Sequence, residues 1–428
     1  MLTSRLLGPA RLLTVALALL LGAALLPAAP AQAARGTVVP RAFFGMHDRD
    51  ATSWPQSGHV GALRLWDSGV AWNQIQRAPG NCATVCDWNR LDAMVGAANA
   101  HRAEVTLVLG QTPAFYATGA PRTGYLGAHA PQMPQLAAWR NYVHSVANRY
   151  AGRVGALQVW NEANVIGFWT GSPSQMATLT YWARVEVNAV NRAKGTHLKL
   201  VSPAWVARSN QGPFATYWKS TKVHGQRMGR LIDAVSLSLY PPASGKPEDA
   251  MTLLARSRRT LTAAHVNKPV WNTEVNYGLS AGGVGARPRT ISADRQAAYV
   301  VRTYLLNAGA RVQRVFWYSW DLDTIANTKL SSVNGAPTGA GTAYGVAASW
   351  LVGNRMQGCS RASTGTYTCT VSVKGGLARI YWNPTRTVTV TTARTATSRT
   401  TQYGRTAHIK GGSALRVDYR PVLVRSKR

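Results

Sequence analysis

The chain has 428 residues, 46% of them hydrophobic, and carries 48 lysines and arginines against 16 aspartates and glutamates, a net charge of +32. Such a charge is typical of nucleic-acid-binding proteins. Here, however, the basic residues are scattered singly among Thr, Ala and Val, without the basic runs and interleaved aromatics that those proteins use. We therefore expect no nucleic-acid partner.

The first 34 residues have the pattern of a secretory signal peptide. Two arginines near the N-terminus precede an apolar run over residues 12–26, and Ala31 and Ala33 form a small-residue cleavage site. A retained membrane anchor is the alternative, but the run is shorter than the ~20 apolar residues that a span needs, and no later segment is apolar enough to span. The mature protein is predicted to be secreted, and extracellular or associated with the cell wall.

From residue 41 to about residue 350, short apolar runs alternate with amphipathic stretches, which is typical of βα repeats around a parallel sheet. Eight strands are predicted, at residues 42–46, 61–66, 104–109, 156–160, 198–202, 234–239, 269–273 and 312–318. Helices are predicted at residues 88–100, 135–150, 174–194, 248–265, 293–308 and 341–351. Eight such units favour an α/β fold of the (β/α)8 TIM-barrel type. A doubly wound sheet would want a glycine-rich phosphate turn after its first strand, which this chain lacks.

A change of pattern after Gly353 predicts a further domain. Thr, Val, Tyr and Arg alternate there without a helical period, and Gly, Pro and Asn separate the runs, as in a small antiparallel β-sandwich. The predicted domains are the signal peptide (residues 1–34), the barrel (35–353) and a basic β-sandwich (354–428) that packs on the barrel.

The predicted sandwich holds 14 basic residues and one acidic residue. A positive field of this kind favours anionic surfaces such as acidic cell-wall polymers. A basic proteome or a solvated face explains the charge equally well, so both explanations stay open.

The four cysteines form two local pairs, Cys82 with Cys86 and Cys359 with Cys369, which agrees with an oxidising compartment. We predict a disulfide for each pair. A metal site at Cys82 and Cys86 is the alternative, but no nearby histidine completes a ligand set. None of the nine histidines forms a His-x-x-x-His or His-Glu-x-x-His pattern. Neither a metal nor a cofactor is predicted.

Two of the five glutamates close predicted strands in matching contexts. Glu162 ends the segment Val-Trp-Asn-Glu, and Glu274 ends Val-Trp-Asn-Thr-Glu, about three βα units of 30-odd residues later. Because the carboxyl ends of barrel strands meet at one mouth, the two carboxylates would face each other across it. Cleavage of a glycosidic bond needs such a pair, one group to protonate the leaving oxygen and one to attack or to activate water.

The other residues at the predicted strand ends are mostly aromatic, amide-bearing or charged. Such a set suits a sugar, whose faces stack on rings and whose hydroxyls take hydrogen bonds. Its members are His47, Asp48, Arg64, Trp66, Asp67, Thr112, Phe115, Tyr116, Asn161, Trp205, Tyr240, Asn276, Trp317, Tyr318, Trp320 and Asp321.

These motifs resemble those of the clan A glycoside hydrolases, and most of all glycoside hydrolase family 39 and its actinobacterial relatives. The resemblance implies a retaining mechanism in which Glu162 is the acid/base and Glu274 the nucleophile. It also implies further substrate-binding or positioning roles, which fall on Asn161 at the sugar 2-hydroxyl, Arg64 and Tyr240 beside the nucleophile, His47, and one of Trp317 and Trp320 as the floor of the sugar subsite.

One departure from the clan concerns a histidine two residues before the strand-six tyrosine, where this chain has Ser238. That histidine helps to arrange the two glutamates, so its absence leaves the sugar undetermined. The leading hypothesis is a secreted retaining hydrolase of a polysaccharide or oligosaccharide. The alternatives are a hydrolase or transglycosylase of an arabinan- or galactan-type cell-wall polysaccharide, and a non-catalytic carbohydrate-binding protein. Each glutamate alone could instead be a buried ion-pair partner, most plausibly of Arg64.

Overall fold

The computed structural model of this protein describes residues 36–50, 54–55, 59–280, 289–321, 326–332 and 335–427. The predicted signal peptide at residues 1–34 lies outside the described residues. Within the described ranges, no helix has both the length and the hydropathy that a membrane crossing requires.

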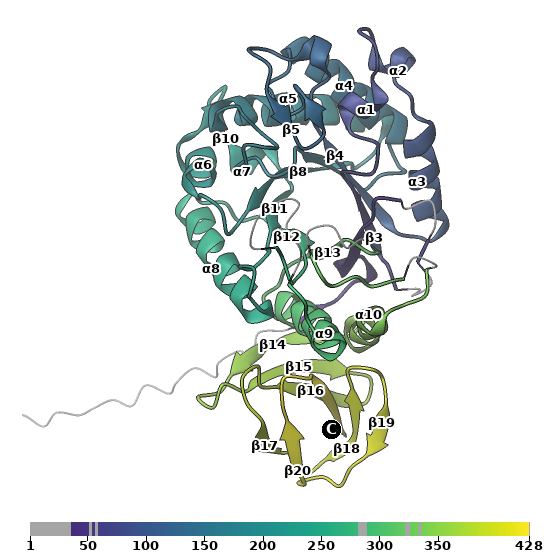
Figure 1. Ribbon diagram of the computed structural model, residues 1–428, viewed down its shortest axis with the longest axis vertical. Helices are drawn as coiled ribbons and strands as arrows, with labels where there is room; N and C mark the ends of the chain where they lie inside the picture. The colour runs from purple at the N-terminus through teal and green to yellow at the C-terminus, as the bar shows by residue number, and fades with distance from the viewer. Residues whose placement is uncertain are drawn as a thin grey trace, which may run out of the picture. The chain divides into compact units, whose positions relative to one another are not determined.

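Eight parallel strands close into a barrel with helices around its outside (Figure 1). In order around the barrel they are β2 (Phe44–His47), β3 (Ala62–Leu65), β4 (Glu104–Leu109), β7 (Ala156–Val159), β8 (Lys199–Val206), β11 (Ala234–Ser238), β12 (Val270–Val275) and β13 (Arg314–Tyr318). The barrel closes because β13 pairs with β2 in parallel. All eight predicted strands are confirmed, although several of their ends are shifted.

The six predicted helices are confirmed as α3 (Asn89–Ala100), α4 (Leu136–Tyr150), α5 (Pro173–Lys194), α8 (Pro247–Ala263), α9 (Ala293–Gly309) and α10 (Gly339–Leu351). The longest, α5, shows why local sequence fixed them so well. Ser172 and Gln175 form a capping box, with Ser172 Oγ accepting from the Gln175 N–H at 3.1 Å, and Pro173 occupies the first turn. Gly195 then ends the helix in the left-handed conformation, at φ 63°.

Short elements occupy the loops between these strands and helices. They are η1 (Arg41–Phe43), α1 (Trp72–Ile75), α2 (Cys82–Val85), η2 (Ala114–Tyr116), β5 (Thr123–Gly124), β6 (Gly127–Ala128), α6 (Gly212–Ala215), η3 (Thr216–Ser220), β9 (Lys222–Val223), β10 (Gln226–Arg227) and α7 (Met228–Leu231). None of these short elements was predicted from the sequence.

The barrel interior changes from apolar to polar along the strands. Toward their amino ends, Ala62, Ala156 and Ala234 share one buried cluster with Trp271 and Phe316, where the small alanines leave room for the two rings. Because side chains alternate between the two sides of a strand, the next inward positions lie two residues further on. They carry the buried polar groups of Arg64, Gln158, Ser236, Thr273 and Tyr318. The buried polar side chains are therefore concentrated toward the carboxyl ends of the strands.

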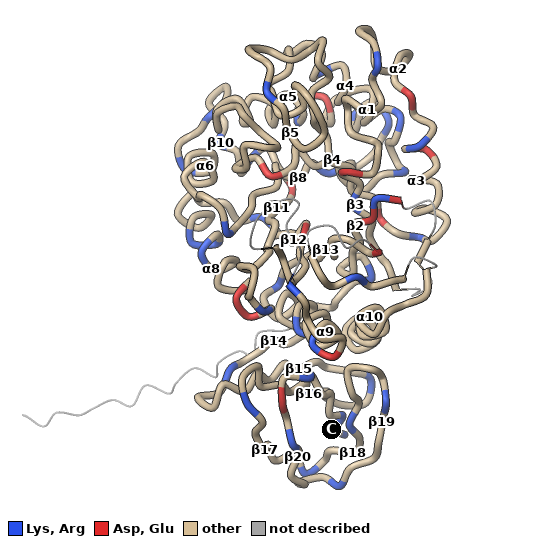
Figure 2. Tube along the Cα trace, viewed as in Figure 1, with Lys and Arg blue, Asp and Glu red and all other residues tan. Residues whose placement is uncertain are grey.

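The chain beyond α10 forms antiparallel sheets (Figure 1). The larger has seven strands in the order β1 (Thr37–Val38), β14 (Arg355–Arg361), β15 (Tyr367–Val373), β16 (Gly376–Trp382), β21 (Val422–Lys427), β18 (Ala396–Thr401) and β19 (Thr406–His408). The smaller pairs β17 (Val388–Thr391) with β20 (Ala414–Val417). Tyr381 and Val424 of the larger sheet share an apolar cluster with Leu415 and Val417 of the smaller, as the predicted sandwich requires. Figure 2 shows Lys and Arg spread along these strands.

The strand β1 corrects the predicted domain boundaries at one point. Its Thr37 pairs with Met356 of β14, so residues that precede the barrel belong to the C-terminal sheet. A strand of two residues has no alternation from which it could be predicted. The predicted boundary after residue 353 otherwise stays a prediction.

Glu248 links the barrel helices to the large sheet. From α8 its Oε1 accepts a hydrogen bond from Arg302 Nε of α9 at 2.9 Å and another from the Trp382 indole of β16 at 2.8 Å. A second contact between Arg302 and Glu248 makes this a two-point ion pair. The predicted packing of the C-terminal region on the barrel is therefore confirmed at this contact.

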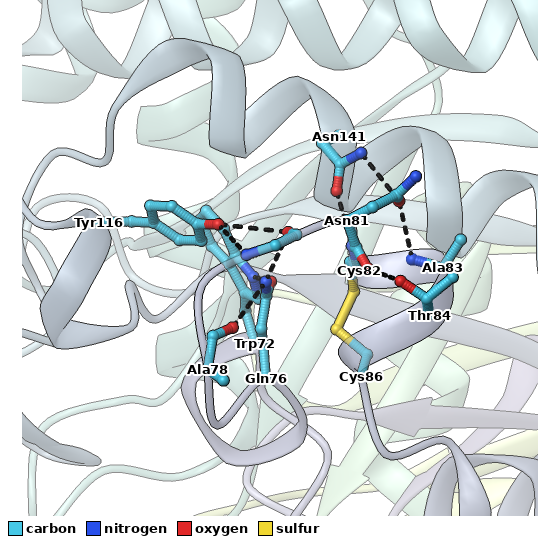
Figure 3. Close-up of a disulfide and its surroundings, with 11 residues drawn as sticks. Trp72, Gln76, Ala78, Asn81, Cys82, Ala83, Thr84, Cys86, Tyr116 and Asn141 are labelled. Carbon is cyan, nitrogen blue, oxygen red and sulfur yellow. Dashed lines mark hydrogen bonds between the residues drawn. A yellow bond between two sulfur atoms is a disulfide. The ribbon is translucent and has the colours of Figure 1, made fainter.

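Both predicted disulfides are confirmed. Cys82–Cys86 closes the short helix α2, whose N-terminal Asn81 accepts from the Ala83 N–H at 3.0 Å, while Asn141 of α4 accepts from the Cys82 N–H at 2.8 Å (Figure 3). Cys359–Cys369 joins directly paired residues of β14 and β15. Each bridge therefore fixes a local loop and does not join distant parts of the chain.

Candidate active site

A cavity of about 260 Å³ opens at the carboxyl ends of the barrel strands. Rings, amides and carboxylates make up most of its wall. It is lined by Trp66, Asp67, Tyr125, Asn161, Glu162, Val165, Phe168, Val206, Arg208, Ser209, Tyr240, Glu274, Leu279, Ser280 and Tyr318. Both predicted glutamates therefore share one cavity, as the pairing of their strand-end motifs indicated.

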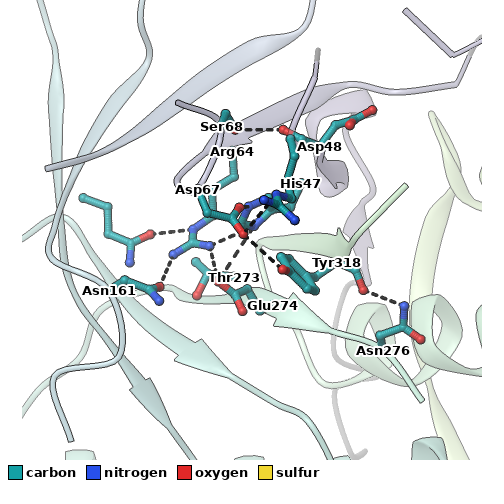
Figure 4. A network of polar contacts seen from close by, with 12 residues as sticks. His47, Asp48, Arg64, Asp67, Ser68, Asn161, Thr273, Glu274, Asn276 and Tyr318 are labelled. Atoms are coloured by element: carbon teal, nitrogen blue, oxygen red, sulfur yellow. Dashed lines mark hydrogen bonds and ion pairs between the residues drawn. The ribbon is translucent and has the colours of Figure 1, made fainter. Parts of the chain in front are cut away.

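Glu274 is held by donors on both carboxylate oxygens. Arg64 Nη1 donates to Oε1 at 2.6 Å (Figure 4), and the Tyr240 hydroxyl donates to Oε2 at 3.1 Å. The rest of the Arg64 guanidinium is fixed by Gln158 Oε1 at 3.0 Å and Asn161 Oδ1 at 2.7 Å. With a donor on each oxygen, the Glu274 carboxyl group has one fixed orientation.

A β-bulge turns Glu274 toward the cavity. The pairing of β11 with β12 advances from Leu237↔Asn272 to Ser238↔Glu274, so two steps on β12 oppose one step on β11. Strict alternation would place Thr273 inside and Glu274 outside the barrel, since Thr273 Oγ1 already bonds the inward Ser236 hydroxyl at 2.6 Å. The bulge re-aims the following residue, and Glu274 consequently joins the cavity wall.

Behind Glu274 lies a second layer formed by His47 and Asp67. His47 Nδ1 lies 3.1 Å from Arg64 Nη1, which can only donate, so Nδ1 accepts and the ring proton sits on Nε2, 2.8 Å from Asp67 Oδ1. Asp67 also accepts from the Tyr318 hydroxyl at 3.1 Å (Figure 4) and from the Tyr125 hydroxyl at 3.1 Å. Burial acts to raise the pKa of Asp67, but its interaction with His47, followed by the Arg49 charge and the Tyr125 hydrogen bond, outweighs burial and lowers that pKa to about 2.

Glu162 follows β7 in a strained turn. Trp160 and Glu162 take left-handed backbone conformations, at φ 62° and φ 40°. The Trp160 ring lies on Gly110, where an added Cβ would approach the ring to 2.6 Å, and its indole donates to Phe168 O at 2.6 Å. Strain of this kind costs of order 1–3 kcal/mol and persists only where packing enforces it. Here it places the Glu162 side chain in the cavity.

The environment of Glu162 favours its protonated form. Burial, followed by the charge of Glu274, raises the pKa of Glu162 to about 8, while Arg208 and Arg64 act in the opposite direction. Glu162 therefore keeps a proton near neutral pH that it can give, in the same cavity as Glu274, whose two oxygens are fixed by Arg64 and Tyr240. This is the division of roles that an acid/base and a nucleophile require.

The structure brings six of the eight predicted catalytic or binding residues together. Glu162, Glu274, Asn161 and Tyr240 line the cavity, and Arg64 and His47 lie just beneath it. The two tryptophans differ from the expectation, since neither lines the cavity. Trp317 points out of the barrel, donating to Thr328 O at 3.0 Å, and Trp320 packs edge-on against Tyr344 of α10.

Tyr318, and neither of the two tryptophans, is the aromatic residue of this segment that lines the cavity. It lies between them in the chain, and alternation along β13 turns it inward, while Asn276 Nδ2 holds its carbonyl oxygen at 2.5 Å (Figure 4). Ser238, at the position of the clan histidine, is buried and lies close enough to Glu162 to act against the rise of its pKa.

Other cavity residues lie outside the motifs. Tyr125 and Phe168 come from loops, and Arg208 follows β8 by two residues. Trp66, Asp67 and Tyr318 had been identified from the sequence, through their place at predicted strand ends. Across the described ranges, no three His, Cys, Asp or Glu side chains gather as metal ligands.

Comparisons with known proteins support the fold. No protein-family model and no curated protein matches the sequence. Among solved structures, a family 39 glycoside hydrolase from Bacteroides cellulosilyticus WH2 superposes with TM-score 0.67 at 18% identity, over 91% of this chain and 81% of that one.

Two further solved structures each cover 92% of this chain and 98% of their own. A monomeric β-xylosidase from Caulobacter crescentus has TM-score 0.64 at 14% identity, and a family 30 endoxylanase from Clostridium papyrosolvens has TM-score 0.59 at 12% identity. At such identities the likeness concerns the fold. This chain therefore shares the barrel architecture of the family 39 and family 30 glycoside hydrolases, and the predicted resemblance to family 39 is confirmed at that level.

Proposed function

We propose that this protein is a secreted retaining glycoside hydrolase. The observation that carries the proposal is the pair of glutamates in one cavity. Arg64 and Tyr240 donate to the two oxygens of Glu274, while burial and the charge of Glu274 raise the pKa of Glu162. An ion pair with a purely structural role would not require a second, protonated carboxyl group in the same cavity. The two disulfides are compatible with an oxidising compartment.

In the proposed first step, Glu274 attacks the anomeric carbon while Glu162 gives its proton to the glycosidic oxygen, so that the leaving sugar departs as an alcohol. In the second step, Glu162, now a carboxylate, removes a proton from water, and the resulting attack on the anomeric carbon releases Glu274. The Asn161 amide, whose oxygen accepts from Arg64, is oriented with its nitrogen available for a sugar hydroxyl. Neither step needs a metal or a cofactor.

The proposal is tested by incubating the full chain with a panel of aryl glycosides and polysaccharides that includes β-xylosides and glucosides, because one structural neighbour is named a β-xylosidase and another a glucosidase. Release of reducing ends, with product of unchanged anomeric configuration by NMR, is expected. Inverted product would contradict the double displacement. Transfer to a sugar hydroxyl in place of water would favour the transglycosylase alternative, and binding without cleavage would favour a carbohydrate-binding protein.

We further propose that the basic C-terminal sheets retain the protein on an anionic polymer. Arg399, Arg405 and Arg416 are exposed side chains at one groove of these sheets. Replacing the three with glutamine should lower retention on anionic cell wall at low salt, whereas 1 M salt, with a screening length of about 3 Å, should release both proteins. Equal retention of the two proteins at low salt would contradict this role.

A further inference from the structure

Arg208 is a cation on the cavity wall that no carboxylate within the described residues pairs with. It lines the cavity beside Glu162 and Tyr240, yet none of the ion pairs among described residues involves it. Its Nη1 donates to Pro241 O at 3.3 Å, and its guanidinium carbon lies 5.5 Å from the centre of the Tyr240 ring. One of five guanidinium N–H groups is therefore engaged, and the side chain is otherwise exposed.

The acidic groups of the same cavity are already compensated. Glu274 is paired with Arg64, and Asp67 accepts from His47, Tyr125 and Tyr318. Glu162 lies close enough to Arg208 that this arginine opposes the rise of its pKa more strongly than Arg64 does, but the two groups form no ion pair. A bound sugar would therefore meet one uncompensated positive group, two residues beyond the end of β8.

We propose that Arg208 recognises a carboxylate on the substrate, so that the enzyme acts on a glycan containing uronic acid. A guanidinium presents a planar pair of donors that matches the two oxygens of a carboxylate. The inference rests on the proposed function for the claim of cleavage, but the recognition of the carboxylate can be measured by itself. The carboxylate belongs either to the sugar that the two glutamates flank or to its neighbour in the glycan.

Two ligand pairs distinguish these sources. 4-Nitrophenyl β-glucuronide and β-glucoside differ only in the carboxylate of the sugar at the two glutamates. A glucuronic-acid-branched xylo-oligosaccharide and its carboxyl-reduced form differ only in a carboxylate on a neighbouring sugar. Binding is measured by calorimetry on the full chain carrying Glu274→Gln, which prevents turnover, alone and combined with Arg208→Gln or with Arg227→Gln. Arg227 lies exposed on β10, outside the cavity, and its replacement removes the same charge.

In at least one pair, the acidic ligand is expected to bind about 10-fold or more tightly than its neutral partner. Arg208→Gln should bring this ratio close to one, and Arg227→Gln should leave it unchanged. No preference in either pair, no binding of any of the four ligands, or the same loss of preference in both variants would overturn the inference. An equal loss of acidic and neutral binding in Arg208→Gln would also overturn it, because Arg208 would then shape the cavity without recognising charge.

The proposed function fails separately. If the enzyme with Glu274 intact cleaves neither members of these pairs nor other glycosides, but the preference for acidic ligands persists through Arg208, the protein is a carbohydrate-binding protein and the inference stands. If neutral glycosides are cleaved and no acidic preference exists, the inference is wrong and the proposed function stands.

Discussion

Two buried arginine–glutamate pairs in this protein are alike in exposure and differ in use. The Arg64 and Glu274 side chains are 0% and 7% exposed, and those of Arg302 and Glu248 are 1% and 7% exposed. Glu248 accepts hydrogen bonds from Arg302 and from the Trp382 indole, and these contacts join the barrel helices to the C-terminal sheet. Glu274 instead borders a cavity in which a second carboxyl group, Glu162, has a raised pKa.

Burial of a charged pair therefore does not by itself identify a catalytic residue. An ion pair sealed by an aromatic donor has all its groups satisfied, and its loss is felt in stability. An ion pair at the wall of a cavity keeps an oxygen oriented toward a space that a substrate can fill, and its loss is felt in turnover.

The largest expected effect is a difference in activity between variants of Glu274 and Glu248. Glu274→Gln should lower kcat/KM by about 10⁴-fold or more, because the amide cannot form the covalent intermediate. Glu248→Gln, the same change in an equally buried pair, should leave kcat/KM within about 2-fold, because Glu248 touches no part of the cavity. Steady-state kinetics on a cleaved aryl glycoside measures both. Similar losses in the two variants would break the contrast.

Loss of the Glu248 ion pair should lower stability. Glu248→Ala leaves Arg302 buried without its counter-ion and should lower the free energy of unfolding by about 3–5 kcal/mol. Urea denaturation followed by tryptophan fluorescence measures the change, with the exposed Arg227→Gln variant as the control. A Glu248→Ala protein as stable as the parent would show that the pair between α8 and α9 is dispensable.

Glu162 should make stability depend on pH. Its pKa is raised from 4.5 to about 8, so the native state keeps a proton that the unfolded chain has lost, and stability falls as pH rises through this window. Glu162→Gln cannot ionise, so its stability relative to the parent should grow between these pH values, by an amount on the order of a few kcal/mol. Thermal unfolding at pH 4.5, 6 and 8 tests this. A constant difference would contradict the raised pKa.

The smallest effect concerns the aromatic seal on Glu248. Trp382→Phe keeps a ring against Tyr367 but removes the indole N–H that donates to Glu248. A hydrogen bond to a charged group contributes about 1.5–3 kcal/mol, so the loss of unfolding free energy should be smaller than in Glu248→Ala. The variant that combines Glu248→Ala with Trp382→Phe should lose less unfolding free energy than the sum of the two single variants, because both changes remove the same hydrogen bond. Additive losses would indicate that the indole acts only by packing.

Local sequence determined most of the framework. Apolar runs of strand length, separated by amphipathic stretches with caps such as Ser172 and Gly195, placed all eight barrel strands and six helices. The matching contexts of Glu162 and Glu274 identified the two carboxyl groups that share the cavity, because parallel strands bring their carboxyl ends to one mouth. Both disulfides followed from cysteines that are neighbours in sequence.

Tertiary structure decided which neighbouring side chain faces the cavity. On β13, Phe316, Trp317 and Tyr318 are all large, and strands buried on both faces show no apolar alternation that would reveal the inward positions. The bulge on β12 and the strained turn at Glu162 likewise depend on pairing with β11 and on packing against Gly110. Arg208 entered the cavity from a loop without any motif, and β1 joined β14 across more than 300 residues of chain. Such contacts arise from the closure of the barrel and its packing, which a local pattern does not encode.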